Sequence, residues 1–293
     1  MFECCRPASR LPSGYGMIAG VSGIYDEPEL YELACAYRDV PAEVTAIQAW
    51  CARHHAGPVS SVLELAAGPA EHARELARRG LRATALDRSP AMCGYAAAQA
   101  KAAGVELAVV EADMREFAIP GGTQGDQGGF DLAVTMLNSA CHLFTLDDLV
   151  RHLSAVRAQL AAGGLYIVEL AHPADFFGAV PRTSSDWTVA APGLTAEVRW
   201  GGRNDHIDPL TQVTREHMTI TATTDDGTIR TVSDVVPNRF WTLTEFTAAT
   251  ALSNATAPGS GAFELAASYG DFDETTTLDA PTAWRMVLIL QRT

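Results

Sequence analysis

Short apolar segments alternate with helical segments between residues 58 and 171. The apolar segments are of strand length, and most are followed by a stretch with leucine or alanine at helical spacing. Alternation of this kind is typical of a parallel sheet covered by helices on both faces, with ligands bound beyond the carboxyl ends of the strands. The predicted strands are 59–65, 81–86, 106–110, 130–136 and 165–170, and the predicted helices are 72–79, 89–103 and 146–160.

The pattern changes after Pro173 from helical to alternating. Three segments rich in Thr and Val follow, and the Asp-Asp-Gly run at 225–227 between the last two is a hairpin signal. We therefore expect an antiparallel insertion over 183–236, then one helix and two closing strands. The alternating segments are 195–200, 212–223 and 228–236, the helix begins at Thr242, and the closing strands are 262–269 and 284–292.

The charge of the chain narrows the functions it can have. It has 293 residues, with 21 Lys and Arg against 35 Asp and Glu, and a formal net charge of −14. Because nucleic-acid binding relies on basic side chains that neutralise phosphates, no nucleic-acid partner is expected. Lys101 is the only lysine, so a Schiff-base or pyridoxal phosphate mechanism would have to depend on it, and we set those classes aside.

Cysteine spacing and hydropathy bear on location. No two of the six cysteines have the two-residue spacing that grips zinc or forms a redox pair, so no metal site is expected. No run approaches the roughly 18 apolar residues of a membrane span, and Pro and Gly interrupt the first twenty residues before a signal-peptide core can form. We expect a reduced cytoplasmic protein without a membrane anchor, with residues 1–23 loosely ordered.

Segment 64–70, Glu-Leu-Ala-Ala-Gly-Pro-Ala, and Asp87, which follows Glu64 by 23 residues, carry a family resemblance. Together they resemble motif I and the acidic end of the second strand in class I S-adenosylmethionine-dependent methyltransferases. The resemblance continues through 111–114 (Glu-Ala-Asp-Met), the fourth strand with 137–139 behind it, and 160–169, and it covers roughly residues 24–293.

The resemblance implies an α/β fold with a Rossmann-like, doubly wound, seven-stranded sheet whose last strand is antiparallel. It also implies a helical lid before the sheet and an antiparallel sheet inserted within it. We divide the chain into a tail and helical lid at 1–57, a cofactor-binding core at 58–182, the insertion at 183–236, and the C-terminal part of the core at 237–293.

The cofactor implied by the resemblance is S-adenosyl-L-methionine. In the family, Asp87 would hold the ribose, Glu64 and the Gly68 turn would line the methionine portion, and Asp113 with Met114 would flank the adenine. A carboxylate at a strand end can accept two ribose hydroxyls, and a glycine lets the backbone approach a ligand. Further candidate cofactor contacts are Tyr25, Arg38, Ala66, Arg88 and Asn138, and for Asn138 a turn role is nearly as plausible.

Ala66 and Ala70 depart from the family pattern, which usually has glycine at both positions. Alanine disfavours positive φ and places a methyl group toward the ligand. Two interpretations follow: a slightly different loop with normal binding, which we favour, or weakened use of the cofactor.

The acceptor side carries fewer signals. Segment 138–143 follows the fourth strand and lacks the Asn-Pro-Pro-Tyr type of motif found in enzymes that methylate bases or glutamine, so a small-molecule acceptor is favoured. His142 is either a general base or a histidine bonded to backbone. The lid tyrosines, Tyr25 and Tyr31, either contact ligand or only pack. Candidate substrate-binding residues are Tyr31, His142, Trp200, Arg215 and Arg239.

The leading hypothesis is methyl transfer to nitrogen or oxygen of a small metabolite, in natural-product or secondary metabolism. The alternatives are an elimination or cyclisation enzyme on the same fold, since fold does not fix chemistry, and a non-catalytic partner subunit. The insertion is predicted to be a substrate roof, a homodimer or partner interface, or both.

Overall fold

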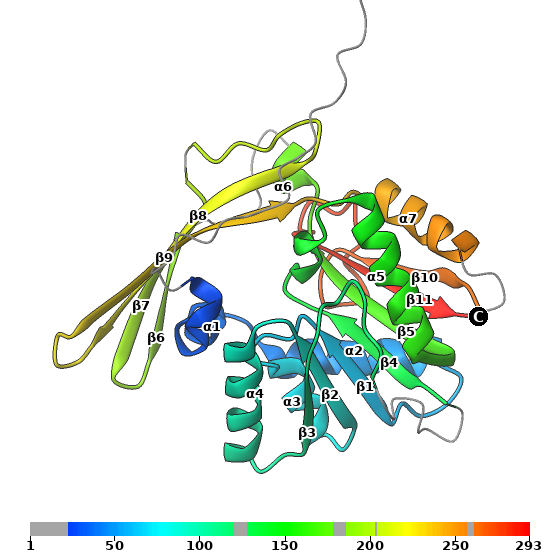
Figure 1. The fold of residues 1–293 in the computed structure, drawn as a ribbon, viewed down its shortest axis with the longest axis horizontal. Helices are drawn as coiled ribbons and strands as arrows, with labels where there is room; N and C mark the ends of the chain where they lie inside the picture. The colour runs from blue at the N-terminus through cyan, green and yellow to red at the C-terminus, as the bar shows by residue number, and fades with distance from the viewer. Residues whose placement is uncertain (1–22, 120–127, 178–185, 203, 257–260) are drawn as a thin grey trace, which may run out of the picture.

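The computed structural model describes residues 23–119, 128–177, 186–202, 204–256 and 261–293. A seven-stranded sheet forms the core, in the order β10-β11-β5-β4-β1-β2-β3 (Figure 1). The five strands from β1 to β5 are parallel, whereas β11 runs antiparallel to both β5 and β10. The strands are β1 (Ser61–Leu65), β2 (Arg82–Asp87), β3 (Leu107–Glu111), β4 (Phe130–Thr135), β5 (Leu160–Ala171), β10 (Phe263–Tyr269) and β11 (Arg285–Arg292).

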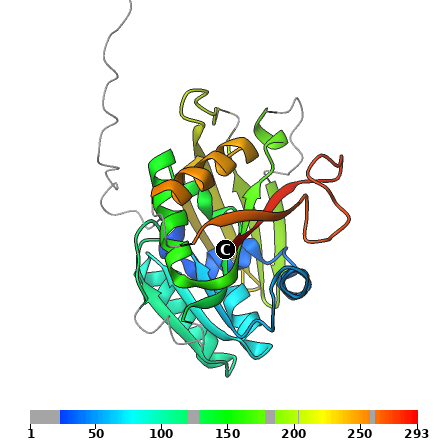
Figure 2. The same ribbon diagram turned by 90° about the vertical axis from the view of Figure 1, so that its right-hand side faces the viewer.

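Helices cover both faces of this sheet, because each carries an apolar stripe that must be buried. One apolar cluster joins the sheet to α2, α3 and α4, and a second joins the opposite face to α5 and α7. Figure 2 looks onto the edge formed by β10 and β11, with α7 beside them. The helices are α1 (Pro28–Cys35), α2 (Val40–His54), α3 (Glu71–Arg78), α4 (Pro90–Ala102), α5 (Leu146–Gln159), α6 (Ala174–Phe177) and α7 (Leu243–Thr256), with short 3-10 turns η1 (Ile24–Asp26) and η2 (Ser139–His142).

A second, four-stranded antiparallel sheet lies beyond the carboxyl ends of the core strands, and we call it the roof sheet. Its inner face packs apolar side chains against η1 and α1. Figure 1 shows α1 beside this sheet. We call residues 24–54 the lid. Its first part, η1 and α1, lies between the roof sheet and the core, whereas α2 packs on one face of the core sheet. The roof strands are β6 (Asp186–Ala191), β7 (Leu194–Trp200), β8 (Val213–Thr224) and β9 (Ile229–Arg239).

The predicted fold class is confirmed, and two details differ. Strand β6 was not predicted, because its six residues carry little alternation of apolar and polar positions. Strand β5 begins at Leu160, so Gly163 and Gly164 lie within it and not before it. A Cβ at Gly164 would lie 2.9 Å from the Ala161 oxygen and 3.0 Å from the Phe130 oxygen, which explains the need for glycine there.

No helix in the described ranges has both the length and the apolar composition needed to cross a membrane. The predicted loose order of residues 1–23 concerns a segment that lies, apart from Gly23, outside the described residues.

Candidate functional site

A cavity of about 1370 Å³ lies between the lid, the carboxyl ends of the core strands and the roof sheet. Core strands, lid and roof each contribute to its wall, which matches the position expected for ligands of a parallel sheet. Glu64 and Arg239 are the two predicted site residues that do not line it. The predicted residues that do are Tyr25, Tyr31, Arg38, Ala66, Gly68, Asp87, Arg88, Asp113, Met114, Asn138, His142, Trp200 and Arg215.

The turn after β1 keeps a glycine-like backbone despite its alanines. Ala66, Gly68 and Ala70 have φ of 49°, 53° and 58°, all in the left-handed region. Alanine disfavours this conformation for steric reasons, as we expected. Both alanines nevertheless adopt it, because the surrounding structure compensates the steric cost. The backbone shape of a three-glycine loop is therefore retained, with one added methyl group at the cavity, that of Ala66.

Asp87 fixes this turn from the end of β2. Its Oδ2 accepts from the Gly68 backbone N–H and its Oδ1 from the Ser89 backbone N–H, each at 2.8 Å. Burial raises the pKa of Asp87, and the two backbone hydrogen bonds oppose that shift. Each carboxylate oxygen has a further lone pair, so Asp87 can still accept from a ligand in the cavity.

The predicted adenine contacts behave differently from one another. Met114 is buried at the cavity wall, as a packing residue for a flat ring should be. The Asp113 carboxylate is instead engaged by Arg115, whose Nε lies 2.9 Å from Oδ1, and Arg115 lowers the pKa of Asp113. Arg88 is exposed at the rim. Arg115, which was not predicted as a site residue, thus forms an ion pair with Asp113, the side chain that was predicted to contact adenine.

The buried carboxylate of Glu64 forms a hydrogen bond within the protein. Its side chain is 3% exposed and its Oε2 accepts from the Ala73 backbone N–H at 2.7 Å. Ala73 lies in the first turn of α3, where backbone N–H groups have no helical partner and favour an anion. The prediction that Glu64 lines the methionine portion is therefore corrected, because this carboxylate caps α3 and does not reach the cavity wall.

Arg38 also has protein partners. It donates to both oxygens of Glu43 and to both oxygens of Glu169, the last at the end of β5. Glu43 in turn accepts from His72 at 2.8 Å and from Arg285 at 2.9 Å. We predicted that Arg38 would pair with a carboxylate of cofactor or acceptor, and the structure pairs it with two carboxylates of the chain. Five buried charged side chains thus join lid, core and the last strand.

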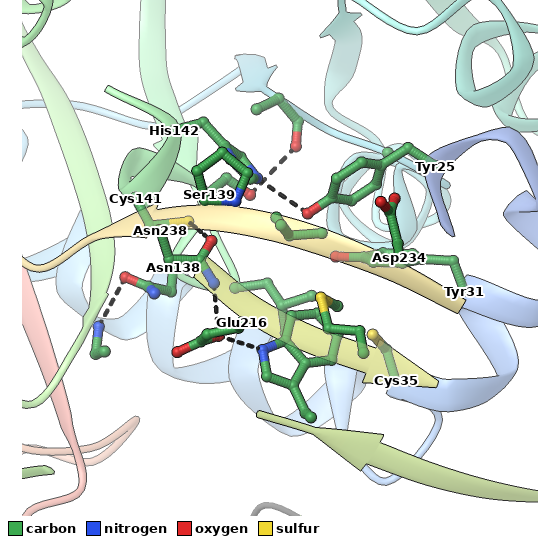
Figure 3. A pocket seen from close by; sticks show the side chains of 18 of the residues that line it. Tyr25, Tyr31, Cys35, Asn138, Ser139, Cys141, His142, Glu216, Asp234 and Asn238 are labelled. Atoms are coloured by element: carbon green, nitrogen blue, oxygen red, sulfur yellow. Dashed lines mark hydrogen bonds between the residues drawn. The ribbon is translucent and has the colours of Figure 1, made fainter. Parts of the chain in front are cut away.

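Tyr25 and His142 meet at the cavity wall. The Tyr25 hydroxyl lies 3.0 Å from His142 Nε2, and the two rings form an edge contact with centroids 5.6 Å apart (Figure 3). Burial, with a smaller effect from the Arg88 charge, lowers the pKa of His142 to about 4. The imidazole is therefore neutral at physiological pH, and Nε2 accepts the hydroxyl proton when the proton of the ring lies on Nδ1.

Asn138 and Arg239 show which predicted roles are structural. Asn138 is left-handed, with φ of 56°, and its Oδ1 accepts from the Ala171 backbone N–H at 3.0 Å, yet it also lines the cavity. Both interpretations of Asn138 therefore persist. Arg239 donates to the Phe144 carbonyl and stacks on Trp241, 3.9 Å from the ring centroid, so its predicted substrate contact is corrected.

Several polar residues of the roof that line the cavity were not predicted from the sequence, among them Asp234. Glu216 and Asn238 line the cavity from β8 and β9. The sequence did carry a signal for Glu216. This residue is two and four positions before Met218 and Ile220 on the same strand, so it lies on the same face as these buried residues. A polar residue on an apolar strand face indicates a special contact.

Residues 62–164 match a family model described as a methyltransferase domain, and no curated protein matches the sequence. The solved structures below share 15–21% identity with this chain and thus establish its fold.

An S-adenosylmethionine-dependent methyltransferase from Clostridium acetobutylicum is 15% identical, covers 89% of this chain and 95% of its own, and has a TM-score of 0.67. CalS10, an amino pentose methyltransferase from Micromonospora echinaspora, is 21% identical over 90% of this chain and 97% of its own, with a TM-score of 0.62. The sugar N-methyltransferase KedS8 from a Streptoalloteichus species is 20% identical over 97% and 99%, with a TM-score of 0.64. Residues 62–164 are therefore similar to a methyltransferase domain, and the chain shares the fold of the S-adenosylmethionine-dependent methyltransferase from Clostridium acetobutylicum.

Proposed function

We propose that this protein transfers the methyl group of S-adenosylmethionine to a nitrogen or oxygen atom of a small metabolite in a natural-product pathway. The observation that carries this proposal is the single cavity that joins the Asp87 turn to the polar and aromatic side chains of the lid and roof. The matched methyltransferase domain and the S-adenosylmethionine-bound CalS10 structure support the cofactor. CalS10 and KedS8, which act on an amino pentose and on sugars, support a small acceptor.

The residues at the strand ends fit this cofactor. A Cβ on Gly68 would lie no closer than 3.9 Å to any atom beyond its neighbours, so the backbone is open to the cavity at that point. Asp87 would hold the ribose hydroxyls, the turn at 66–68 would lie along the methionine portion, and Met114 would pack on the base. The cofactor supplies an electrophilic methyl group on a sulfonium, and Asp87 gives this end of the cavity the opposite charge.

The chain itself would contribute mainly by holding the two reactants in position and by excluding water from the cavity, and less by proton transfer. The lid and roof cover the cavity, and holding two reactants in line accounts for a large part of the barrier reduction in such reactions. When the ring proton of His142 lies on Nδ1, the Tyr25 hydroxyl donates to Nε2 and keeps its oxygen lone pairs for an N–H or O–H of the acceptor. With a pKa of about 4, His142 is a weak base, so we assign it an orienting role toward Tyr25.

Calorimetry with S-adenosylhomocysteine tests the cofactor site. We expect wild-type protein to bind it and Asp87→Ala to lose at least about tenfold in affinity, because charge-assisted hydrogen bonds contribute about 1.5–3 kcal/mol. Glu111→Gln is the matched control, since Glu111 is the exposed carboxylate paired in register with Asp87 on β3. Undiminished binding by Asp87→Ala would contradict the ribose assignment.

The same measurement separates the alternatives. A folded wild-type protein that fails to bind S-adenosylhomocysteine at about millimolar concentration would favour a non-methylating enzyme on this fold. Size-exclusion chromatography addresses a partner-subunit role, because a stable monomer or homodimer that binds the cofactor argues against an obligate second chain.

A further inference from the structure

Two carboxylates, Glu216 and Asp234, interrupt the apolar inner face of the roof sheet. Asp234 pairs in register with Met218, and its Oδ2 accepts from the Ile24 backbone N–H at 3.0 Å. Successive side chains of a strand alternate between its two faces, so Glu216 points to the same side of β8 as Met218 and Ile220. Those two residues are 1% and 0% exposed, and Glu216 lies beside them at the cavity wall. Because a carboxylate removed from water costs free energy unless it is paired, its presence there calls for a partner.

Among the residues that the structure describes, hydrogen bonds reach only one of the two carboxylate oxygens of Glu216. Its Oε2 accepts from Trp200 Nε1 at 2.8 Å and from Asn238 Nδ2 at 2.6 Å. The Asn238 Oδ1 in turn accepts from Cys141 Sγ at 3.1 Å, so the amide is held in one orientation, as Figure 3 shows. Within the described ranges, no hydrogen bond reaches Oε1 and no basic side chain forms an ion pair with Glu216. The oxygen is available to a ligand in the cavity.

The basic side chains at the cavity wall do not compensate this charge. Arg38 and Arg285 are bound by Glu43, and Arg115 is bound by Asp113. Arg215 immediately precedes Glu216 on β8, so its side chain points to the opposite side of the strand. Arg88 is exposed at the rim of the cavity, and no cation is among the groups that shift the pKa of Glu216. Burial raises the pKa of Glu216, as expected for a carboxylate with no neighbouring cation.

Aromatic rings extend from this carboxylate along the roof. Trp200, which donates to Glu216, stacks on Trp187 with centroids 6.2 Å apart, and Trp187 meets Tyr37 at 5.5 Å. All three rings line the cavity. The faces of such rings attract cations, and aromatic rings combined with a carboxylate are the surroundings in which alkylammonium groups bind.

We propose that Glu216 is a specificity-determining residue that binds a positively charged amine of the acceptor beneath the roof sheet. Its Oε1 accepts a hydrogen bond from the ammonium while the Trp200 and Asn238 contacts hold Oε2 in place. This inference deepens the proposed function and rests on it for its meaning, since the amine belongs to the methyl acceptor. It concerns binding alone, and no proton or methyl group is transferred at Glu216.

A pair of probes that match in shape and differ in charge tests this proposal. Cyclohexylamine is a cation near neutral pH, whereas cyclohexanol is neutral, and ligand-observed NMR gives the Kd of each, with and without S-adenosylhomocysteine. Glu216→Gln removes the charge and keeps the size of the side chain, and its thermal unfolding verifies folding. Glu197→Gln is the matched control, because Glu197 lies on the neighbouring strand β7 and is exposed on the outer face.

We expect wild-type protein and Glu197→Gln to bind cyclohexylamine about tenfold more tightly than cyclohexanol, which is the effect of one charge-assisted hydrogen bond. Glu216→Gln should bind the two probes equally. The proposal is overturned if wild-type protein shows no preference, if the amine does not bind at all, or if Glu216→Gln keeps the preference. Failure of S-adenosylhomocysteine to bind would instead contradict the proposed function, while the amine preference would still be measured without it.

Discussion

At the residue scale, Ala66 and Ala70 share a left-handed backbone but not the surroundings of their methyl groups. Ala66 is half-buried beside the cavity, whereas Ala70 is fully buried in the cluster formed with α2, α3 and α4. A left-handed alanine costs about 1–2 kcal/mol relative to its usual conformation, and glycine avoids that cost. The buried methyl group of Ala70 offsets part of this gain, since burying apolar surface is favourable.

We therefore expect Ala66→Gly to raise the free energy of unfolding by about 0.5–1 kcal/mol, after the greater flexibility of glycine in the unfolded chain is subtracted. Ala70→Gly should be close to neutral. Urea denaturation measures both. Ala98→Gly, in the exposed middle of α4, is the control and should lose about 1 kcal/mol. A loss for Ala66→Gly as large as that for Ala98→Gly would contradict the account of strain.

His142 gives a pH dependence whose sign follows from its pKa. The folded value of about 4 lies below the unfolded value of about 6.5. Between these values the unfolded chain binds more protons than the native one, so the stability contribution falls as pH decreases from about 6.5 to about 4.

The expected outcome is that His142→Asn loses less stability than wild type when urea denaturation is repeated at about pH 7 and about pH 5. His206→Asn is the control, because His206 is exposed, and it should follow wild type. Equal losses in all three proteins would indicate that His142 is accessible to protons in the native state.

At the element scale, α2, α3, β5 and β11 are connected by buried charges. Glu43 of α2 accepts from Arg38, from His72 of α3 and from Arg285 of β11. Burial disfavours the charged form of the Glu43 carboxylate and so raises its pKa. Hydrogen bonds from His72 and Arg38 outweigh this effect and lower the pKa of Glu43 to about 2. Hydrogen bonds to Glu43 and Glu64 likewise raise the pKa of His72 to about 9.

Removing the Glu43 charge should leave its buried partners uncompensated. We expect Glu43→Gln to lower the free energy of unfolding by about 3 kcal/mol. Glu116→Gln is the control: Glu116 pairs with Arg151 but its side chain is 80% exposed, so its loss should be under about 1 kcal/mol. Chemical denaturation compares them, and similar values for the two variants would show that the network contributes little.

His72 adds a second test of this network. Since its folded pKa is above its unfolded one, its contribution is complete below about pH 6.5 and disappears as pH rises through about 9. Wild-type protein should therefore lose stability over this interval, and Glu43→Gln should lose less. Urea denaturation of both proteins at about pH 6.5 and about pH 9 provides the measurement.

The elements that sequence could predict are those with a strong repeating pattern. The run of strands from β1 to β5 follows from apolar segments separated by helices, and the hairpin of β8 and β9 follows from alternation around Gly227. The partners of Arg38 and Asp113 could not be predicted. Those contacts depend on Glu169, which is 131 positions away from Arg38, and on the local rotamer of Arg115. Spacing places a charged side chain at a strand end but does not determine which charge it meets.

At the scale of the whole molecule, the lid is attached to both of its neighbours. The Ile24 backbone N–H donates to Asp234 of the roof at 3.0 Å, and Trp187 Nε1 donates to the Ala34 carbonyl at 2.9 Å. On the core side, the Ser89 hydroxyl donates to the Tyr25 carbonyl at 3.2 Å. A ligand that fills the cavity should therefore tighten the lid.

Hydrogen exchange of backbone amides can detect this tightening of the lid. On saturation with S-adenosylhomocysteine, amides of 24–35 should gain protection, and those of α5 on the far face of the sheet should change much less. Trp187→Phe removes the bond to Ala34 and should reduce the protection of 24–35, whereas Thr188→Ser, on the opposite face of β6, should not. Equal protection in wild type and Trp187→Phe would show that the roof does not hold the lid.

The Ile24–Asp234 contact also orders events during synthesis. Its two residues are separated by 210 positions, so the lid emerges from the ribosome long before the strand that covers it. The parallel strands β1 to β4 can assemble while the roof is still being translated, but β11, which separates β5 from β10, is made last. Closing contacts of such large separation is slow because much chain entropy is lost first. A nascent chain would therefore expose the aromatic residues of its future cavity until the roof and β11 have been translated, which makes this interval the one in which a chaperone would be needed.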